Sequence, residues 1–400
     1  MGKKCGRCST RYCGAECQKQ HWEESGHDKL CKRIKKAGGA EQYNANKRYT
    51  EAVAVAVEKC ADDTKGQTCY ICTQALHWKT KEGLVRMCSC RGTSGFAHVS
   101  CLAEEARILF AEAEENNLDN NAKQARWDRW DTCSLCKQPH HGLVMCALGW
   151  ACWKTYLGRP ETDRPRLMAM NWLGNGLLAV GHNEDALSVQ ETELAMKRRL
   201  GLSEASIFVA QSNLARTYMA LGRVEEALQL ERDVYNGSLR LLGEEDEGTL
   251  ISASNYADSL NGLKRFEESK SLLRRHMPVA RRVLGDSNDL TLKMRKIYAN
   301  VLCDDPGATI DDIREAVTTL EDMEPTVRRL HGGAHPHTVA LGLRVQLARS
   351  VLRARETPPA QADAIDAMRS IREAVEAMTS GLDGKLVLDD ATTQGHEGDA

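Results

Sequence analysis

The chain has 400 residues, more than one compact core usually holds, so two or more domains are expected. Its net charge of −2 offers no overall attraction to nucleic acid or to a membrane. The sequence opens without the apolar stretch of a signal peptide, and its longest apolar run, 143–153, is too short to span a bilayer. We therefore expect a cytoplasmic or nuclear protein, where clustered thiols indicate metal binding before disulfides.

Residues 1–31 form the first cluster of cysteine and histidine. Pairs of soft donors a few residues apart are typical of zinc sites, because a short turn of chain can aim both at one ion. The candidate ligands, in chain order, are Cys5, Cys8, Cys13, Cys17, His27 and Cys31.

This first segment resembles the MYND zinc finger through YC-x-x-x-CQ, a following HW and a closing H-x-x-x-C. The leading C-x-x-C pair of the family is absent. The resemblance therefore implies one complete zinc site, and Cys13 and Cys17 would be half of another. It also implies that the finger recognises short proline-containing peptides. The complete site would consist of Cys5, Cys8, His27 and Cys31.

Residues 32–66 are rich in lysine and poor in aromatic residues, and they include the run AVAVAV. We expect these residues to be a linker that carries no chemistry, and a helix is compatible with their sequence. Residues 1–50 carry 12 Lys/Arg against 5 Asp/Glu. We interpret this excess as a solvated flank of the metal site, so a nucleic-acid partner is not expected.

A second cysteine and histidine segment spans residues 67–142 and contains four closely spaced pairs. Eight such donors suit two tetrahedral Zn²⁺ ions with no open coordination position, which makes the ions structural. A catalytic Cys–His pair would leave six further paired cysteines unexplained. The pairs are Cys69 and Cys72, Cys88 and Cys90, His98 and Cys101, and Cys133 and Cys136.

The middle of this segment, CSCRGTSGFAHVSCL, resembles the RING-CH type of zinc finger, which commonly reads C-x-C-[KR]-G-[ST] and then H-x-x-C-L. A PHD finger shares the ligand order, but its second pair is usually more widely spaced. RING-CH implies a cross-braced arrangement. One zinc would be held by Cys69, Cys72, His98 and Cys101, and the other by Cys88, Cys90, Cys133 and Cys136.

RING-CH fingers are associated with ubiquitin ligases, which dock a charged ubiquitin-conjugating enzyme. The resemblance implies that Ile71, Trp130 and Lys137 contact that enzyme. The alternative is that Ile71 and Trp130 belong to the core of a small domain while Lys137 is solvated. The gap between Cys101 and Cys133 is long for the family, and its stretch EEARILFAEAEENN predicts an inserted helix.

From about residue 160 to 353 the sequence repeats itself. The run 213–228 aligns with 255–270 at an offset of 42, and 172–187 matches at an offset of 41. Farther on, 281–291 aligns with 328–338 at an offset of 47. Leucine and alanine recur at helical spacing within each unit, so the period predicts a solenoid of helical hairpins.

The repeats resemble tetratricopeptide repeats of the kinesin-light-chain kind, which implies a superhelix that binds peptides or partner proteins. After it we expect a capping helix over 354–380 and a disordered tail over 381–400. The predicted fold is thus mainly α, with two small zinc-stabilised modules followed by an α-α superhelical solenoid.

These expectations predict a zinc-binding interaction protein with three zinc ions. Its function would be that of a RING-CH ubiquitin ligase, with the conjugating enzyme on the finger and client proteins on the repeats and the MYND finger. The competing prediction is a non-enzymatic adaptor that uses the same surfaces to bind partner peptides.

Overall fold

The computed structural model describes residues 3–5, 10–12, 14–24, 26–333 and 335–356. The chain divides into two compact units, one of residues up to 87 together with 92–176, the other of residues 88–91 together with those from 177 onward. The predicted tail and all but the first three residues of the predicted capping helix lie outside the described residues. Within the described residues, no helix is both long and apolar enough to cross a membrane.

The first unit begins with a two-stranded antiparallel ribbon and two short helices. Strand β1 (Lys3–Lys4) pairs with β2 (Arg11–Tyr12) in the register Lys3 to Tyr12. Helices α1 (Ala15–Glu23) and α2 (His27–Ala37) follow. Gly38 ends α2 at a φ of 95°, a left-handed conformation that glycine adopts without strain.

The segment expected to be a linker is largely helical, as that expectation allowed, and it packs against the rest of the first unit. The end of α2 and helix α3 (Ala40–Cys60) cover most of it, and α3 packs along α6 (Gly142–Tyr156). The alternation in AVAVAV would place alternate residues on opposite faces of a strand. In the helix, residues three and four positions apart share a face, and only one face is buried. The buried side chains of α3 are Ala45, Tyr49, Val53, Ala56 and Cys60.

The inserted helix predicted between Cys101 and Cys133 is present as α4 (Val99–Glu115), followed by α5 (Asn120–Trp127) and the 3₁₀ turn η1 (Asp128–Trp130). Phe110 of α4 meets Trp127 edge-on at a ring separation of 5.0 Å. The insert therefore belongs to the core of the first unit and is not an addition to its surface.

Helix α7 (Arg164–Leu178) approaches α6 closely at two glycines. A Cβ on Gly149 would lie 3.0 Å from the carbonyl oxygen of Trp172, and one on Gly176 would lie 3.0 Å from the Cα of Cys146. A side chain at either position would force the two helices apart, so the glycines set their distance.

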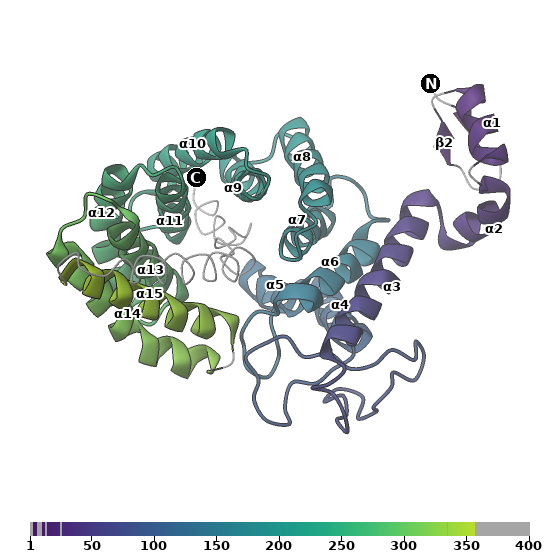
Figure 1. Ribbon diagram of the computed structural model, residues 1–400. Coiled ribbons are helices and arrows are strands. Elements are labelled where there is room, and N and C mark those ends of the chain that lie inside the picture. The colour runs from purple at the N-terminus through teal and green to yellow at the C-terminus, as the bar shows by residue number, and fades with distance from the viewer. Residues whose placement is uncertain (1–2, 6–9, 13, 25, 334, 357–400) are drawn as a thin grey trace. The chain divides into compact units, whose positions relative to one another are not determined.

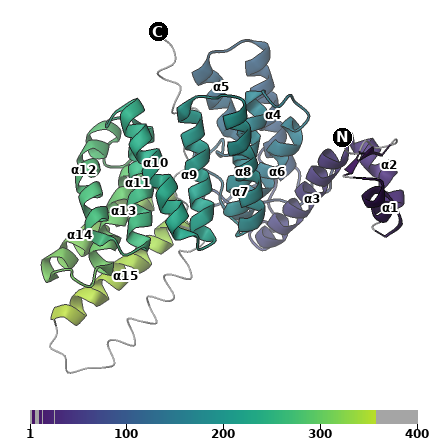
Figure 2. The same cartoon turned by 90° about the horizontal axis from the view of Figure 1, so that it is seen from above.

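The second unit is a row of helices in which each packs against the next (Figures 1 and 2). This arrangement confirms the predicted helical-repeat solenoid and the mainly α fold. The helices are α8 (Asn183–Arg199), α9 (Glu204–Ala220), α10 (Val224–Leu242), α11 (Glu247–Gly262), α12 (Phe266–Leu284), α13 (Asp289–Asp304), α14 (Ile310–His331) and α15 (Pro336–Glu356).

A glycine with a left-handed backbone conformation recurs at the end of every second helix of the solenoid. Gly243, Gly285 and Gly332 follow α10, α12 and α14 with φ of 85°, 91° and 91°. Each is followed six residues later by a buried threonine at the start of the next helix. Glycine adopts this conformation at the lowest cost, which explains why a glycine recurs at this position of the repeat.

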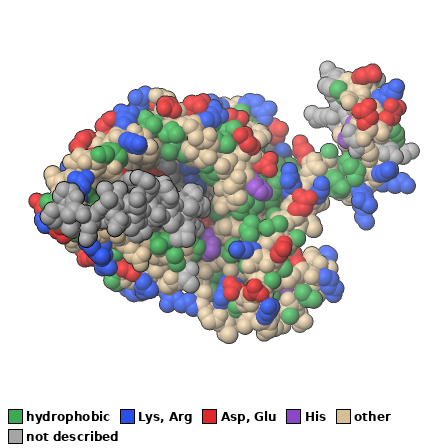
Figure 3. Space-filling view, viewed as in Figure 1, with side chains coloured by type: hydrophobic (Ala, Val, Ile, Leu, Met, Phe, Trp, Pro, Cys, Tyr) green, Lys and Arg blue, Asp and Glu red, His purple; other side chains and the backbone are tan. Residues whose placement is uncertain are grey.

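The surface of the second unit carries paired charges that also repeat. Arg223 contacts Glu226 just as Arg265, 42 residues later, contacts Glu268 at 2.6 Å. On the face drawn in Figure 3, acidic and basic side chains are interspersed over the helices. Exposed pairs of this kind add little stability, so the buried apolar side chains hold the unit together.

Candidate metal centres

The first group of donors consists of Cys69, Cys72, His98 and Cys101, whose ligand atoms all lie within 4.8 Å of one another. The His98 Nδ1 lies 3.4 Å from the Cys72 Sγ and 3.5 Å from the Cys101 Sγ. Tetrahedral zinc with its usual bond lengths separates a sulfur from a nitrogen ligand by about 3.5 Å. The spacing of these donors therefore fits one zinc ion.

A tight loop aims the first two thiols. The Cys69 N–H donates to the Gln74 carbonyl at 3.0 Å, and the Thr73 N–H donates back to the Cys69 carbonyl at 2.8 Å. Thr73 adopts a φ of 62° to close the loop. The Ile71 N–H donates to the Cys69 Sγ at 3.4 Å, a contact that fixes the direction of this sulfur.

His98 is oriented for binding through Nδ1. Its Nε2 lies 3.4 Å from the Ala75 carbonyl, the outer contact that metal-ligating histidines commonly make. Burial lowers the pKa of His98, so the ring is neutral and can offer a lone pair. His98 and Cys101 stand one turn apart at the start of α4, which brings both donors to the same side of the helix.

Glu82 fixes the start of that helix. Its carboxylate accepts hydrogen bonds from the Ser100 N–H at 2.6 Å and the Ser100 hydroxyl at 2.8 Å. A negative charge at a helix N-terminus is stabilising. Sequence reasoning missed this residue, and an isolated glutamate in the sequence gives no signal for such a role.

The second group consists of Cys88, Cys90, Cys133 and Cys136, again within 4.8 Å. Its loop repeats the first: the Cys133 N–H donates to the Gln138 carbonyl at 3.0 Å, and Lys137 takes a φ of 59°. The Tyr70 hydroxyl lies 2.8 Å from the Ser134 Oγ, which joins the two loops at equivalent positions. The two groups contain the same residues that the RING-CH resemblance implies.

A third loop has the same backbone geometry without thiols. The His77 N–H donates to the Glu82 carbonyl at 3.0 Å, and Lys81 closes the loop at a φ of 61°. The His77 Nδ1 and the Thr80 Oγ1 occupy the positions of the two sulfurs, 2.8 Å apart. A hydrogen bond thus takes the place that a metal would hold in the other two loops.

In the N-terminal finger, Cys5, His27 and Cys31 come together and all three are buried. The sulfurs of Cys5 and Cys31 are 3.8 Å apart, which is about the separation that tetrahedral zinc imposes on two thiolates. Cys17 lies exposed on α1 and is not part of this group. Cys8 and Cys13, two further predicted ligands, lie outside the described residues.

The structure separates the three residues expected to contact a conjugating enzyme. Ile71 is 38% exposed and Lys137 is exposed, so both can meet a partner. Trp130 is only 2% exposed, with its ring 5.8 Å from that of Tyr156, so its assignment to a docking surface is wrong. Its side chain belongs to the aromatic core that α4, α5 and α6 share.

Comparison with known families assigns two regions of the chain. The MYND finger family matches residues 2–31, and the tetratricopeptide repeat family matches residues 206–282. The predicted MYND finger and tetratricopeptide repeats are thereby confirmed. The RING-CH identity of 67–142 rests on the sequence resemblance alone. Among curated proteins, none matches the chain significantly.

Several solved structures resemble the chain in part. Two of the "putative kinesin light chain nearly identical TPR-like repeats" of Podosopora anserina, one a point variant, are each 21% identical, with a TM-score of 0.40. Each match covers 54% of this chain and 95% of theirs. BtubC (BKLC) from P. vanneervenii is 14% identical, with a TM-score of 0.38, over 70% of this chain and 91% of its own.

Proposed function

We propose that the protein is a non-enzymatic adaptor whose tetratricopeptide repeats and MYND finger bind partner peptides. The two assigned regions support a zinc-binding protein-interaction role, because both families are interaction modules. In this proposal the finger over 67–142 is a metal-stabilised scaffold that supports the first unit.

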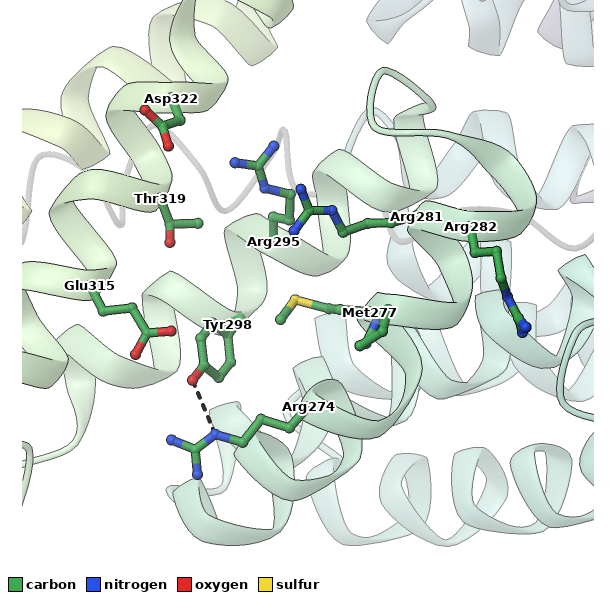
Figure 4. Close-up of a pocket in the computed structure, with 10 residues that line it drawn as sticks. Arg274, Met277, Arg281, Arg282, Arg295, Tyr298, Glu315, Thr319 and Asp322 are labelled. Atoms are coloured by element: carbon green, nitrogen blue, oxygen red, sulfur yellow. Dashed lines mark hydrogen bonds between the residues drawn. The ribbon is translucent and has the colours of Figure 1, made fainter.

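One observation carries the adaptor proposal: a pocket of about 820 Å³ in the solenoid, lined by α12, α13 and α14. Met277, Pro278 and Tyr298 contribute apolar surface to its lining. Figure 4 shows Thr319 of α14 across from Met277 and Tyr298. A space of this size accommodates several side chains of an extended peptide. The pocket lies on helices whose packing fixes its shape, which suits selective recognition.

The proposal includes three zinc ions, two in the finger over 69–136 and one in the MYND finger with Cys8 as its fourth ligand. Bound zinc would link loops that are far apart in sequence. The chain's own contribution is to hold the cysteine sulfurs and the imidazoles in tetrahedral groups with no ligand position left open. Such ions stabilise a fold and do not activate water.

The test is a selection of peptides from a random library on the full chain, followed by affinity measurements by fluorescence anisotropy. We expect Thr319→Trp to weaken binding at least tenfold, because the indole would fill the pocket. Thr318→Trp is the matched control, since Thr318 is exposed beside Thr319 on α14. Equal affinities for the two variants would overturn the pocket's role.

A second candidate function, ubiquitin ligase, is favoured by the exposure of Ile71 and Lys137 next to the two donor groups. In this reading the chain supplies no catalytic side chain and acts by holding a charged conjugating enzyme close to a client. Purified protein would be assayed with ubiquitin, activating enzyme and a panel of conjugating enzymes.

The ligase reading expects ubiquitin chains that Ile71→Ala reduces about tenfold or more, since one apolar anchor contributes of the order of 1–2 kcal/mol. Val55→Ala is the control, because Val55 is a similarly exposed apolar residue on α3. Absence of chains with every conjugating enzyme tested would eliminate this candidate and leave the adaptor.

A further inference from the structure

The second helix of the N-terminal finger, α2, is strongly basic. Five of its eleven residues are lysine or arginine, and all five side chains are exposed. Four of the five recur at steps of three and four residues, so they share one side of the helix, and the fifth lies at the edge of that side. We call this set the basic face of α2. It consists of Lys29, Lys32, Arg33, Lys36 and, at the edge, Lys35.

The opposite side of α2 fixes the direction in which the basic face points. Cys31 and Ile34 are only 1% and 5% exposed, and they pack together with Cys5 and Tyr43. Cys31 also belongs to the third donor group, together with His27 from the first turn of the same helix. The finger's own core therefore covers the apolar side of α2 and leaves the basic face to the solvent.

The basic face is not neutralised by the part of the chain that the structure describes. None of its five side chains forms an ion pair or a hydrogen bond with a described residue. Basic residues of the solenoid behave differently: Arg265 pairs with Glu268 at 2.6 Å, and Arg282 pairs with Glu245 at 2.7 Å. Composition alone indicates a solvated flank, whereas the structure gathers five positive charges without a described partner on one helix.

The density of these charges matches that of a nucleic-acid strand. An α-helix rises about 1.5 Å per residue, so the eleven residues of α2 span about 16 Å. One strand of a DNA duplex carries a phosphate about every 3.4 Å along the axis, which gives about five phosphates over that length. Four of the five cations are lysines, whose compact ammonium groups bind phosphate as point charges.

The composition of α2 disfavours other anionic partners. An acidic peptide would gain most from the paired hydrogen bonds of arginine, but the basic face has a single arginine, Arg33. A helix that lies in a membrane surface needs an exposed apolar side, whereas that of α2 is buried. The helix also has no aromatic residue, asparagine or glutamine with which to read a base. Contacts from this face would therefore go to the phosphates.

We propose that the basic face of α2 binds the phosphate backbone of a nucleic acid, independently of the base sequence. The inference does not rest on peptide binding by the repeats. It adds a second kind of partner, which the finger holds by charge while the repeats and the rest of the finger remain available to peptides.

The test measures the affinity of the full chain for a fluorescein-labelled duplex by fluorescence anisotropy, once with DNA and once with RNA of the same sequence. Two unrelated base sequences should bind equally well. Because bound cations release counterions from the duplex, affinity should fall steeply as salt is raised. If all five side chains contact phosphates of a DNA duplex, the logarithm of the association constant should fall with the logarithm of salt concentration at a slope of about −4.5.

A triple variant, Lys32→Gln, Arg33→Gln and Lys36→Gln, removes three charges from the middle of the basic face. It should bind the duplex roughly tenfold or more weakly at low salt and reduce the slope to about −1.8, the value for two remaining contacts. The exchanged variant, Lys32→Arg, Arg33→Lys and Lys36→Arg, keeps every charge and should keep the affinity.

The matched control removes three charges from exposed positions of the solenoid, through Arg198→Gln, Arg240→Gln and Lys264→Gln. Its net charge equals that of the triple variant, and its affinity for the duplex should be nearly unchanged. Zinc content and thermal unfolding of each variant verify that the finger and the solenoid remain folded.

Equal losses in the triple variant and the solenoid control would overturn the inference, since net charge alone would then explain the binding. An affinity that does not change with salt would also overturn it. Polyglutamate and vesicles containing phosphatidylserine are the competing anions, and binding of either one without binding of the duplex would refute a nucleic-acid partner. The peptide selection on the repeats uses other variants, so either proposal can fail while the other stands.

Discussion

The zinc-finger-like segment 67–142 and the solenoid of the second unit are stabilised in different ways. Residues 61–98, most of which belong to the first unit, contain no helix and no strand, only loops and the isolated bridge between Val85 and Ala97. The solenoid is built of long helices whose buried apolar faces meet. We therefore expect the finger to depend on bonds to metal and the solenoid to depend on packing between neighbouring repeats.

The largest predicted effect follows from removing the metal. Chelation, or Cys101→Ser, should unfold the loops of residues 61–98, because structural zinc contributes on the order of 10 kcal/mol to such folds. The amide groups of the solenoid should remain protected from hydrogen exchange. Hydrogen exchange read by mass spectrometry on separate peptides checks both parts at once.

Cys303→Ser is the control for that experiment, because Cys303 is buried in the solenoid and belongs to no donor group among the described residues. Metal analysis should give three zinc ions per chain before chelation. If both units lost hydrogen-exchange protection equally on chelation, the solenoid would also depend on metal. The proposed difference between the two units would then be wrong.

The zinc-ligand pairs and the repeats could both be recognised from the sequence, because each depends on a local pattern. Metal donors lie two to four residues apart, so a local pattern identifies Cys69 and Cys72, or Cys133 and Cys136, as ligand pairs. The repeat period can be read from the sequence for a similar reason. Each helical hairpin makes equivalent contacts with its neighbours and ends with an equivalent glycine.

The errors concern residues whose role depends on distant partners. The packing of the stretch expected to be a linker could not be foreseen, because its buried side chains meet α6, about 100 residues later in the chain. The RING-CH resemblance implies a surface position for Trp130, but the inserted helix α4 packs against it and it is buried. No local pattern contains either contact, and Glu82 was missed for the same reason.

The second largest effect is the difference in stability lost when a buried and an exposed leucine of the solenoid are each changed to alanine. Leu302→Ala should lower the free energy of unfolding by about 2–5 kcal/mol, because Leu302 is fully buried and the change leaves a cavity. Leu241→Ala, the same substitution at a side chain that is 47% exposed, should cost much less. Urea denaturation measures both. Similar losses would mean that the solenoid does not rely on its buried contacts.

A smaller effect concerns the close approach of α6 and α7 in the first unit. Gly149→Ala should destabilise this unit by about 1–3 kcal/mol, because the new methyl group meets the backbone of Trp172 and Leu173. Gly342→Ala in α15 is the control: nothing lies near its added Cβ, and alanine favours the helix by up to about 1 kcal/mol. A stabilising Gly149→Ala would show that the helices can move apart freely.

The smallest effect is a pH dependence confined to the solenoid. His276 is fully buried in α12, and its Nε2 lies 2.9 Å from the Tyr235 hydroxyl. Burial lowers the pKa of His276 below its ordinary 6.5, although the nearby Glu244 carboxylate opposes the shift and Arg275 adds to it. Below about pH 6.5 the unfolded chain therefore binds a proton that the native chain refuses, so stability falls as the pH falls and is unaffected above about pH 7.5.

His276→Gln should remove this dependence, because glutamine can meet the Tyr235 hydroxyl but does not titrate. The measurement is hydrogen exchange of peptides from α10 to α13 at pH 7.5 and 5.5, corrected for intrinsic exchange. Reading these helices separately matters, because acid also protonates thiolates and releases zinc from the first unit. If the variant lost as much protection at pH 5.5 as the unchanged chain, the acid sensitivity of the solenoid would belong to another group. A loss confined to the unchanged chain would show that each unit responds to acid through its own chemistry, metal release in one and a buried imidazole in the other.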